Sequence, residues 1–445
     1  MSIEIFTLGG YEEVGRNMTA VKVGHQIVIL DIGFSMEKVY MLEDATSLFG
    51  EHELASREVI PDDTPIKDLR NKVSAIVASH GHLDHIGAIP IVAPKYNAPV
   101  LGTPFTTELV KEELKERKEK LKKITAMNAG EVLEIGDISI EFIHITHSIP
   151  QTIFTAIHTD EGVIFYGSDF KFDNFQVLSK RPDYKRIKEL GNEGVKCLIT
   201  ESVRADEYRK TPSETVAKEL LRNTLLETMN EDRGIIITSF SSHIERLNSI
   251  VEASRELNRD LIFVGRSLGK YVKVAERVGI RKFPDIEVAS KPKSIRRVLS
   301  EASRDKGDYI LVVTGSQGEP TSVLSKLVNN TYDYKLEGGD EVIFSCNTIP
   351  NPGNIENRKN LEHKISAHGA RVFQDVHVSG HAAREDHRDL INMLKPDHII
   401  PCHAFSEKLN AYWNLANDIN KEYKEDKYKL GETVHLSKDG ARIVI

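Results

Sequence analysis

The sequence predicts an α/β protein with more than one domain, and three features of its 445 residues support this. The first half alternates short apolar runs typical of strands with segments of helical periodicity. One of these runs, 73–78, leads into a cluster of histidines and an aspartate. From about residue 211, strands and helices alternate regularly, which indicates a parallel sheet with crossover helices. The length is sufficient for two or three domains with their own cores.

The expected strands of the first half are short apolar runs. They are residues 3–8, 20–23, 27–31, 73–79, 138–145, 154–158, 163–167 and 197–200. Between them, the charged stretch 108–123 has apolar residues at helical spacing. We expect a helix there, with its charged side facing solvent.

The second half predicts a different arrangement of elements. Helices are expected at 213–229 and 243–257, and strands at 235–238, 261–264, 309–313 and 342–345. After about residue 369 the pattern is strand, helix, strand again. In that part we expect a strand at 375–378 leading to His381, and a strand at 398–401 leading to His403.

Composition narrows the class of protein. Hydrophobic residues make up 40% and charged residues 28%, which is typical of soluble globular proteins. We expect neither a signal peptide nor a membrane span. The three cysteines are odd in number and widely spaced, so we do not expect a disulfide framework. We expect a cytoplasmic location instead. The cysteines are Cys197, Cys346 and Cys402. The net charge of −8 means that a nucleic-acid partner would need a local basic channel.

Four potential metal ligands, His80, His82, Asp84 and His85, follow a predicted strand. Side chains two residues apart on an extended chain point the same way, so His80 and His82 can share one metal ion. Asp84 and His85 come from the following turn and can reach a second ion. Imidazole and carboxylate together suit Zn²⁺ or Mn²⁺. The alternative, a polar loop that is merely rich in histidine, is disfavoured because a strand, a glycine turn and four ligand-type residues coincide.

Three further candidate ligands, His147, Asp169 and His403, each follow a predicted strand. Polar ligands at strand ends are what a metal site at a sheet edge requires. Taken singly, each is a weak signal, but with the first motif they complete a two-metal shell. The expected ligands are His80, His82 and His147 for one ion and Asp84, His85 and His403 for the other, with Asp169 bridging both.

Such a pair of divalent ions lowers the pKa of a shared water and clamps both oxygens of an in-line displacement. Asp31 lies at the end of the expected strand 27–31. It is a candidate for a residue that does not bind the metal itself but orients a ligating histidine or its loop. His144 faces away from His147 on a regular strand, so we expect it to be structural.

Asp31, the His80–His85 cluster, His147 and Asp169 resemble the four sequential motifs of the metallo-β-lactamase superfamily. The resemblance implies an αββα sandwich with the metals at one edge. The long gap between Asp169 and His403 resembles the β-CASP branch, whose members cleave nucleic acids between two domains. We therefore expect metallo-β-lactamase segments at 1–205 and 366–445, and an inserted β-CASP α/β domain at 206–365.

Further motifs resemble the ribonuclease J family in its shorter archaeal form. Glu201, His381 and His403 match the three β-CASP motifs. The other matching stretches are 9–18, 147–150, 167–173, 264–267, 314–320 and 377–381.

The resemblance implies a 5′→3′ exoribonuclease that acts on single-stranded RNA, prefers a 5′ monophosphate and allows internal cleavage. It implies two Zn²⁺ ions, with Mn²⁺ or Mg²⁺ as alternatives, and a homodimer. The expected catalytic residues are His381, Asp169, Glu201 and Asp31. His381 would protonate the leaving 3′ oxygen or hold a phosphate oxygen.

The expected RNA-binding residues lie at a helix start and in a loop of small residues. A helix N-terminus offers free amides to an anion, and small residues let the backbone approach a phosphate. In the family, the positions matching the helix start hold the 5′ phosphate. The residues are Ser242, His243 and Ile244 at the helix start, and His377, Val378, Ser379, Gly380 and His381 in the loop.

Three other functions remain open at this stage. One is an endoribonuclease of the 3′-end-processing type. Another is a small-molecule ester or lactone hydrolase, which the long insertion disfavours. The third is a non-catalytic RNA-binding scaffold, which the complete ligand set disfavours. The sequence alone does not choose between metals, or between RNA and DNA.

Overall fold

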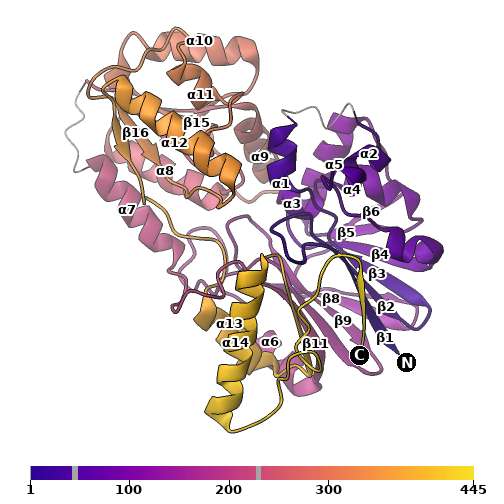
Figure 1. Ribbon diagram of the computed structural model, residues 1–445. Coiled ribbons are helices and arrows are strands. Elements are labelled where there is room, and N and C mark those ends of the chain that lie inside the picture. The colour runs from indigo at the N-terminus through magenta and orange to yellow at the C-terminus, as the bar shows by residue number, and fades with distance from the viewer. Residues whose placement is uncertain (1, 43–48, 227–231) are drawn as a thin grey trace. The chain divides into compact units, whose positions relative to one another are not determined.

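The computed structural model describes residues 2–42, 49–226 and 232–445 (Figure 1). The chain forms two compact units. The first unit comprises Met1–Asn174, Ser179–Thr211 and Gly380–Ile445, and the second comprises Phe175–Leu178 and Pro212–Ser379. The segment expected as an insertion, 206–365, overlaps the second unit, which continues to Ser379.

In the described part of the first unit, one sheet has seven strands. Its order is β19 (Ala441–Val444), β1 (Ile3–Gly9), β2 (Met18–Val23), β3 (Gln26–Leu30), β4 (Val73–Ala78), β5 (Val100–Gly102) and β6 (Ile124–Ala126). Pairing is antiparallel from β19 to β3 and parallel from β3 to β6.

The other described sheet of this unit has six strands. Its order is β18 (His398–Cys402), β11 (Val195–Glu201), β10 (Gly162–Gly167), β9 (Ile153–Thr159), β8 (Ile138–His144) and β7 (Val132–Ile135). β18, β11 and β10 are parallel, and the remaining pairs are antiparallel.

Alternate residues of β10 separate two hydrophobic cores, because side chains along a strand point to opposite faces. Ile164 and Tyr166 belong to the core shared with the seven-stranded sheet. Val163 and Phe165 pack on the opposite face. That face is covered by the helices α6 (Tyr184–Glu193), α13 (Arg384–Leu394) and α14 (Ser406–Tyr423), as Figure 1 shows. The expected αββα sandwich is confirmed.

The other described helices of the first unit are mostly short. They are α1 (Met36–Met41), α2 (Glu51–Ser56), α3 (Leu83–Ile86), α4 (Ile89–Val92), α5 (Pro104–Arg117) and the 3₁₀ segments Thr64–Lys72 and Ala93–Lys95. The helix expected at 108–123 is α5, which begins and ends earlier than expected. Pro104 suits a first helical turn, and Lys118 ends the helix in the left-handed conformation, with φ 61°.

The described second unit contains one six-stranded sheet. Its order is β14 (Glu287–Ala289), β13 (Asp260–Val264), β15 (Tyr309–Val313), β12 (Ile235–Thr238), β16 (Glu341–Phe344) and β17 (Arg371–Phe373). Every pair is parallel, so the expected parallel sheet is confirmed. The helices are α7 (Glu214–Leu226), α8 (Ile244–Glu256), α9 (Arg266–Arg277), α10 (Pro292–Ala302), α11 (Val323–Val328) and α12 (Pro352–Ala367), with a 3₁₀ turn at Lys306–Asp308.

One helix expected in the second unit ends outside the described residues, and one strand expected there is wrong. The last part of the helix expected at 213–229, residues 227–229, lies outside the described residues. The strand expected at 375–378 is wrong, because the strand there is β17, which ends at Phe373. Asp375 has a φ of 59°, which is incompatible with a continuing strand. Among the described residues, we find no helix whose length and apolar character would let it span a bilayer.

Shortening a side chain in the core beneath α14 tests this packing. Phe165 is fully buried, and its ring centroid lies 5.1 Å from that of Phe154. We expect Phe165→Ala to lower the free energy of unfolding by about 3–5 kcal/mol, because it leaves a cavity. The single tryptophan, Trp413, packs against the same core and reports urea unfolding by its fluorescence. Val132→Ala on exposed β7 is the control, and equal midpoints for the two variants would contradict the assignment.

Candidate metal centre

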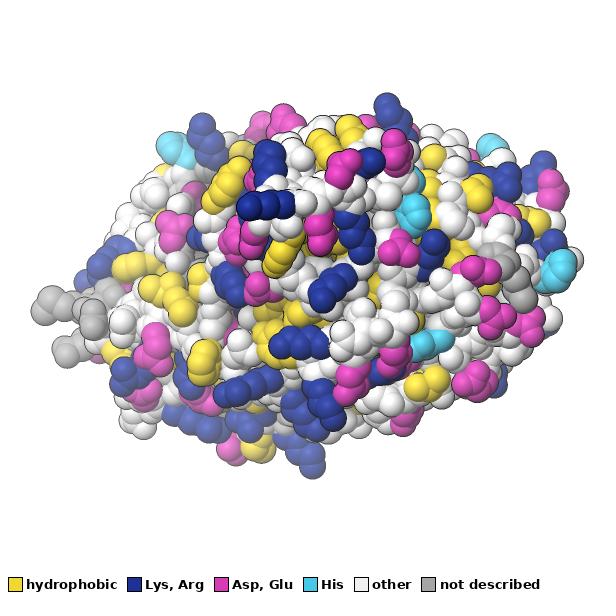
Figure 2. Space-filling model, turned by 90° about the horizontal axis from the view of Figure 1, so that it is seen from below, with side chains coloured by type: hydrophobic (Ala, Val, Ile, Leu, Met, Phe, Trp, Pro, Cys, Tyr) yellow, Lys and Arg dark blue, Asp and Glu magenta, His cyan; other side chains and the backbone are white. Residues whose placement is uncertain are grey.

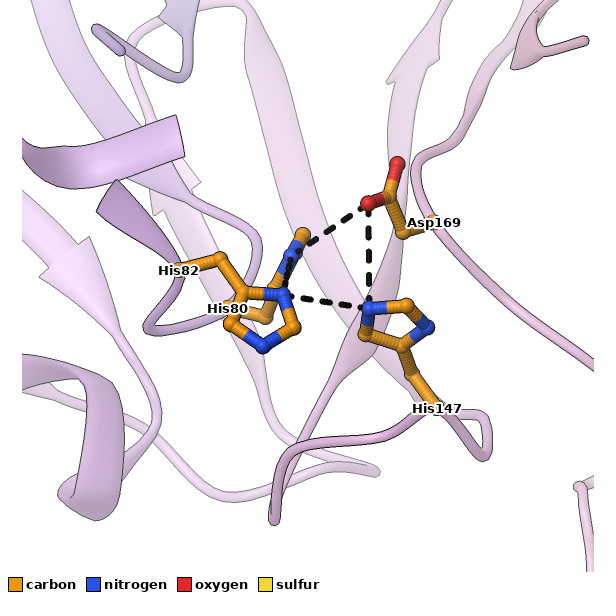
Figure 3. A group of neighbouring side chains, drawn as sticks. All are labelled: His80, His82, His147 and Asp169. Carbon is orange, nitrogen blue, oxygen red and sulfur yellow. Dashed lines mark hydrogen bonds and ion pairs between the residues drawn. The ribbon is translucent and has the colours of Figure 1, made fainter. Parts of the chain in front are cut away.

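One group of donors lies where β4, β8 and β10 end, and its side chains point toward one another (Figure 3). His82 Nδ1 lies 3.2 Å from both His80 Nε2 and His147 Nε2. Asp169 Oδ2 lies 3.7 Å from each of the latter two nitrogens. The donor atoms of all four residues lie within 4.8 Å of one another. This spacing suits a single cation bound by three imidazoles and a carboxylate.

Burial keeps these three histidines in the form that binds metals. It lowers the pKa of His80 and His147 well below the ordinary value, and that of His82 to about 4. The rings are therefore neutral at neutral pH, with a lone pair available for a cation. His147 Nδ1 donates to the carbonyl of Gly380 at 2.7 Å, which leaves Nε2 to face the other donors.

A second group comprises Asp84, His85, His403 and again Asp169. His85 Nε2 lies 3.3 Å from Asp169 Oδ2 and 3.9 Å from Asp84 Oδ2. His403 Nε2 lies 3.7 Å from Asp84 Oδ2 and 3.6 Å from Asp169 Oδ1. Burial lowers the pKa of His85, but Asp169 and Asp31 outweigh it and raise that pKa well above the ordinary value. This group therefore holds a proton that a cation would displace.

Asp169 is the residue that the two groups share. Its Oδ1 is buried and accepts no hydrogen bond from any described residue. Burial raises the pKa of Asp169, but His403 and His85 outweigh it, so the pKa lies well below the ordinary value and the carboxylate is charged. A buried carboxylate oxygen without a donor is rare and costly unless a cation compensates it. The donor set and this oxygen therefore fit a pair of divalent cations.

Asp31 lies behind His85, at the end of β3, and is fully buried. Its Oδ2 accepts hydrogen bonds from His85 Nδ1 at 2.8 Å, the Tyr166 hydroxyl at 2.8 Å and the Ser79 hydroxyl at 2.7 Å. Its Oδ1 accepts from the Ser79 backbone N–H at 2.7 Å. The contact to Nδ1 turns Nε2 of His85 toward the second group. Asp31 thus orients a candidate ligand and is itself outside both donor groups.

The loop after Asp31 runs directly against the turn that carries Asp84 and His85. The Ile32 N–H donates to the carbonyl of His85 at 2.8 Å. A Cβ on Gly33 would lie 1.6 Å from the carbonyl oxygen of Asp84, so only glycine permits this approach. This close backbone contact fixes the position of Asp84 and His85 relative to the end of β3.

Glu201 and His381 form a third group with Asp169. His381 Nδ1 lies 3.1 Å from Glu201 Oε2 and 3.8 Å from Asp169 Oδ2. Glu201 Oε1 also accepts from the backbone N–H groups of Phe170 and Ala382. Burial lowers the pKa of His381, but Glu201 and Asp169 outweigh it and raise the pKa to about 9. His381 therefore carries a proton at neutral pH, and at 26% side-chain exposure a substrate can reach it.

The remaining expected site residues belong mostly to the second unit. Ser242 and His243 lie between β12 and α8, and the ring of His377 lies 6.3 Å from that of Phe240 in the same loop. The structure therefore brings these two segments together. Ile244 is fully buried and its N–H donates to the Ser242 carbonyl, so it offers no side-chain contact to a ligand. Val378 is buried and Ser379 is half-buried.

Gly380 and His381 belong to the first unit. A Cβ on Gly380 would lie 2.6 Å from Ser148 Oγ and 3.0 Å from the Ser148 nitrogen, so a side chain is excluded where this loop passes the His147 turn.

On the face shown in Figure 2, Lys and Arg side chains are interspersed with Asp and Glu side chains, and are most frequent toward the lower left.

Sequence reasoning missed several residues that support the donors. Tyr166 lies in the expected apolar strand 163–167, yet its hydroxyl donates a hydrogen bond to Asp31. A buried tyrosine needs a partner for its hydroxyl, which is the signal that was available. Asn17 lies in a recognised motif but had no assigned role; its Nδ2 lies 3.1 Å from His85 Nε2.

Three family models match successive parts of the chain. A β-lactamase superfamily domain matches residues 48–208, a ribonuclease J β-CASP domain matches 232–365, and a Zn-dependent metallo-hydrolase RNA specificity domain matches 369–429.

Several curated proteins are similar over nearly the whole chain. Ribonuclease J of Methanocaldococcus jannaschii is 46% identical, covering 99% of this chain and 98% of that protein. Ribonuclease J of Pyrococcus abyssi is 44% identical, covering 98% and 96%. Ribonuclease J 1 of Streptococcus pyogenes is 30% identical and covers 99% of this chain and 76% of that protein. A solved structure, a protein of unknown function from Enterococcus faecalis, matches with a TM-score of 0.66 at 17% identity, covering 100% of both chains, which shows the fold alone.

Removing the charge of Asp31 tests its role behind the donors. We expect Asp31→Asn to weaken metal binding by about 10–100-fold, because His85 loses the carboxylate that orients it. Metal retained per chain after dialysis against a weak chelator, determined by mass spectrometry, measures the effect. Asp137→Asn, in the exposed turn between β7 and β8, is the control. Equal retention by both variants would show that Asp31 does not orient a ligand.

Proposed function

Because the chain belongs to the ribonuclease J family, it is a hydrolytic nuclease, and we propose that it removes nucleotides from the 5′ end of single-stranded RNA with the help of two zinc ions. The observation that carries this proposal is Asp169, which is shared by two donor groups and lies 3.8 Å from His381. A hydrolase that cuts phosphodiesters needs cations and an acid at one place. Asp169 joins the residues suited to both tasks.

The residues proposed to hold the first ion are His80, His82 and His147, and those for the second are Asp84, His85 and His403. Asp169 would bridge them. When bound, the two cations would supply a nucleophile at neutral pH and offset the charge of the phosphate. Three imidazoles in one group favour zinc over magnesium, which prefers oxygen ligands. Manganese fits the same mixed donor set.

His381 is proposed as the proton donor. Glu201 Oε2 lies 3.1 Å from its Nδ1 and so fixes the direction of the ring, which is 26% exposed. Burial lowers the pKa of His381, but Glu201 and Asp169 outweigh it, which favours the ring with its acidic proton. It would pass to the 3′ oxygen as that oxygen leaves, or stabilise a non-bridging phosphate oxygen. Glu201 itself is held by two backbone N–H groups, which keeps the ring direction constant.

The second unit is proposed to bind the 5′-terminal phosphate. Ser242, His243 and Ile244 at the start of α8, and His377, Val378 and Ser379 at the end of the unit, are the candidate residues. Hydroxyl, imidazole and backbone N–H donors suit a phosphate monoester. Binding of the terminal phosphate would make cleavage start at the 5′ end. Consistent with the family, we also propose a homodimer acting in the cytoplasm, which light scattering and cell fractionation can test.

The direction of degradation is the first test. We expect RNA labelled at a 5′ monophosphate to release labelled mononucleotide, and the same RNA with a 5′ hydroxyl or triphosphate to react more slowly. Gel electrophoresis of a time course measures this. Products that shorten from the 3′ end would contradict the proposal. Cuts in a circular RNA without end-dependent trimming would favour a 3′-processing endonuclease, and faster turnover of a chromogenic ester would favour a small-molecule hydrolase.

The acid is tested separately. We expect His381→Gln to lower kcat by about 10²–10⁴-fold while leaving KM and metal content unchanged, because only proton transfer is lost. Single-turnover kinetics on monophosphorylated RNA measure this effect. His158→Gln is the matched control, since that ring pairs with Glu141 at 2.8 Å, outside the three donor groups. If the kcat of His381→Gln is close to that of the control, His381 is not the proton donor.

A further inference from the structure

Tyr208 is the most exposed large hydrophobic or aromatic side chain among the residues that the structure describes, with 80% of its surface accessible. It lies in the loop 202–211, which follows β11 and belongs to the first unit. Single exposed side chains of this kind are common, and exposure alone indicates no function. The neighbours of Tyr208, however, hold its ring in place and cover only one of its faces.

The guanidinium group of Arg384, in the first turn of α13, lies against one face of the Tyr208 ring. Its Cζ is 4.6 Å from the ring centroid, a distance at which a cation and a π-face attract each other. Arg384 is 1% exposed, and it donates to the Ala411 carbonyl at 3.2 Å and to Asp418 Oδ2 at 2.7 Å, both on α14. The support under the ring is therefore rigid, because the arginine cannot move away without breaking both hydrogen bonds.

The loop that carries Tyr208 is also fixed along its backbone. The carbonyl of Glu207 accepts from the Arg384 N–H at 3.1 Å. The carbonyl of Arg209 accepts from the Glu385 N–H, also at 3.1 Å. The Glu207 carboxylate accepts in addition from Arg209 Nε at 2.9 Å. Because both chain neighbours of Tyr208 are held, a ligand that binds the ring has little conformational entropy left to remove.

The same loop is bound to the segment that carries the candidate acid, His381. The hydroxyl of Thr211 donates to the His381 carbonyl at 2.6 Å, and the Thr211 N–H donates to Asp386 Oδ2 at 2.8 Å. Arg384 follows His381 by three residues, so their Cα atoms are at most about 10–11 Å apart. The ring supported by Arg384 therefore lies within the length of a short piece of RNA from the residue proposed to act on the cleaved phosphodiester.

A rigid aromatic ring with one open face suits the flat surface of an unpaired nucleobase. Stacking on such rings is a main source of affinity for single strands, and it tolerates any sequence because every base has a π-face. The exposed cations beside the ring, Arg209 and Lys210, are each paired with a carboxylate, Glu207 and Asp389 respectively. The surroundings of the ring therefore favour a base over a phosphate as the group bound here.

We propose that Tyr208, supported by Arg384, is a stacking platform for one unpaired base of the RNA substrate. This inference rests on the proposed function, and adds a binding site that lies outside both the three donor groups and the second unit. The base would contact the ring and not the hydroxyl. The platform would raise the affinity for single-stranded RNA with little regard to sequence, and would take no part in proton transfer.

Exchange of the side chain tests the platform. We expect Tyr208→Ala to raise the Kd for single-stranded RNA by about tenfold, because stacking on one base is lost. Tyr208→Phe keeps the ring and should bind like the wild type, whereas Tyr208→Leu keeps an apolar side chain without a flat π-face and should bind like Tyr208→Ala. Fluorescence anisotropy measures the Kd, with a 3′-labelled oligoribonucleotide whose phosphorothioate linkages resist hydrolysis.

The matched control is Tyr423→Ala, which removes another exposed tyrosine, 52% accessible, at the end of α14. It should leave the Kd as in the wild type. A Kd for Tyr208→Ala equal to that of this control would overturn the proposal. So would a lower melting temperature of Tyr208→Ala with no change in Kd, since the ring would then only pack on Arg384.

Changes in the RNA identify the base that is bound. We expect an abasic nucleotide at one position of the oligoribonucleotide to weaken binding to the wild type by about tenfold. The same RNA should bind Tyr208→Ala no more weakly than the intact RNA does, because both changes remove one and the same contact. Additive effects of the two changes at every position tested would contradict stacking on Tyr208.

The comparison of RNA ends separates this inference from the proposed function. The ratio of the Kd of Tyr208→Ala to that of the wild type should be the same for 5′-monophosphate and 5′-hydroxyl RNA, since the platform does not bind the terminus. A wild type that does not bind single-stranded RNA would refute the proposed function together with the platform. A wild type that binds this RNA no better than Tyr208→Ala does would refute the platform alone.

Discussion

The candidate centre depends on one buried carboxylate, Asp31, which is hydrogen-bonded to both sheets of the sandwich. Ser79 approaches it from the end of β4 in one sheet, and Tyr166 approaches from β10 in the other. His85 comes from the short helix α3. A buried charge costs several kcal/mol unless it is fully satisfied, and here four donors satisfy it. Because every donor must be in place at once, the carboxylate fixes the spacing between the sheets at the edge where the ligands gather.

The candidate donors beside Asp31 are themselves oriented by hydrogen bonds, and together they could hold a cation. Asp31 accepts a hydrogen bond from Nδ1 of His85, and the Gly380 carbonyl accepts one from Nδ1 of His147. These contacts turn Nε2 of both rings toward Asp169. None of the described residues donates a hydrogen bond to the buried Oδ1 of Asp169. His82 Nδ1 lies at hydrogen-bonding distance, 3.2 Å, from one nitrogen of each of the rings of His80 and His147. An unsatisfied buried oxygen such as Asp169 Oδ1 reduces stability, and folds tolerate such groups at functional sites because the surrounding structure is rigid.

Much of the fold and of the donor set could be predicted from sequence, because both follow from local patterns. Apolar strands that end in ligand-type residues place those residues at a sheet edge, whatever the rest of the chain does. The sequence predictions failed where the local pattern was weak, or where the feature depends on residues far apart in the sequence. The strand expected at 375–378 is apolar enough, but the left-handed Asp375 ends the ladder. Glu214 and Arg246 lie on different helices and have the composition of solvated faces, so nothing local in the sequence marks them as a buried pair.

The two units place buried charge by opposite means. In the first unit, carboxylates and imidazoles face one another in groups that could hold a metal ion. In the second unit the positive charge is built in, because Arg246 is balanced by Glu214 and needs no ion to adopt its position. This pair therefore holds the backbone at Ser345 and Val376 without a metal ion. The proposed binding of the RNA end therefore draws on charges that the chain itself supplies, whereas the proposed cleavage draws on cations that the donor groups could hold.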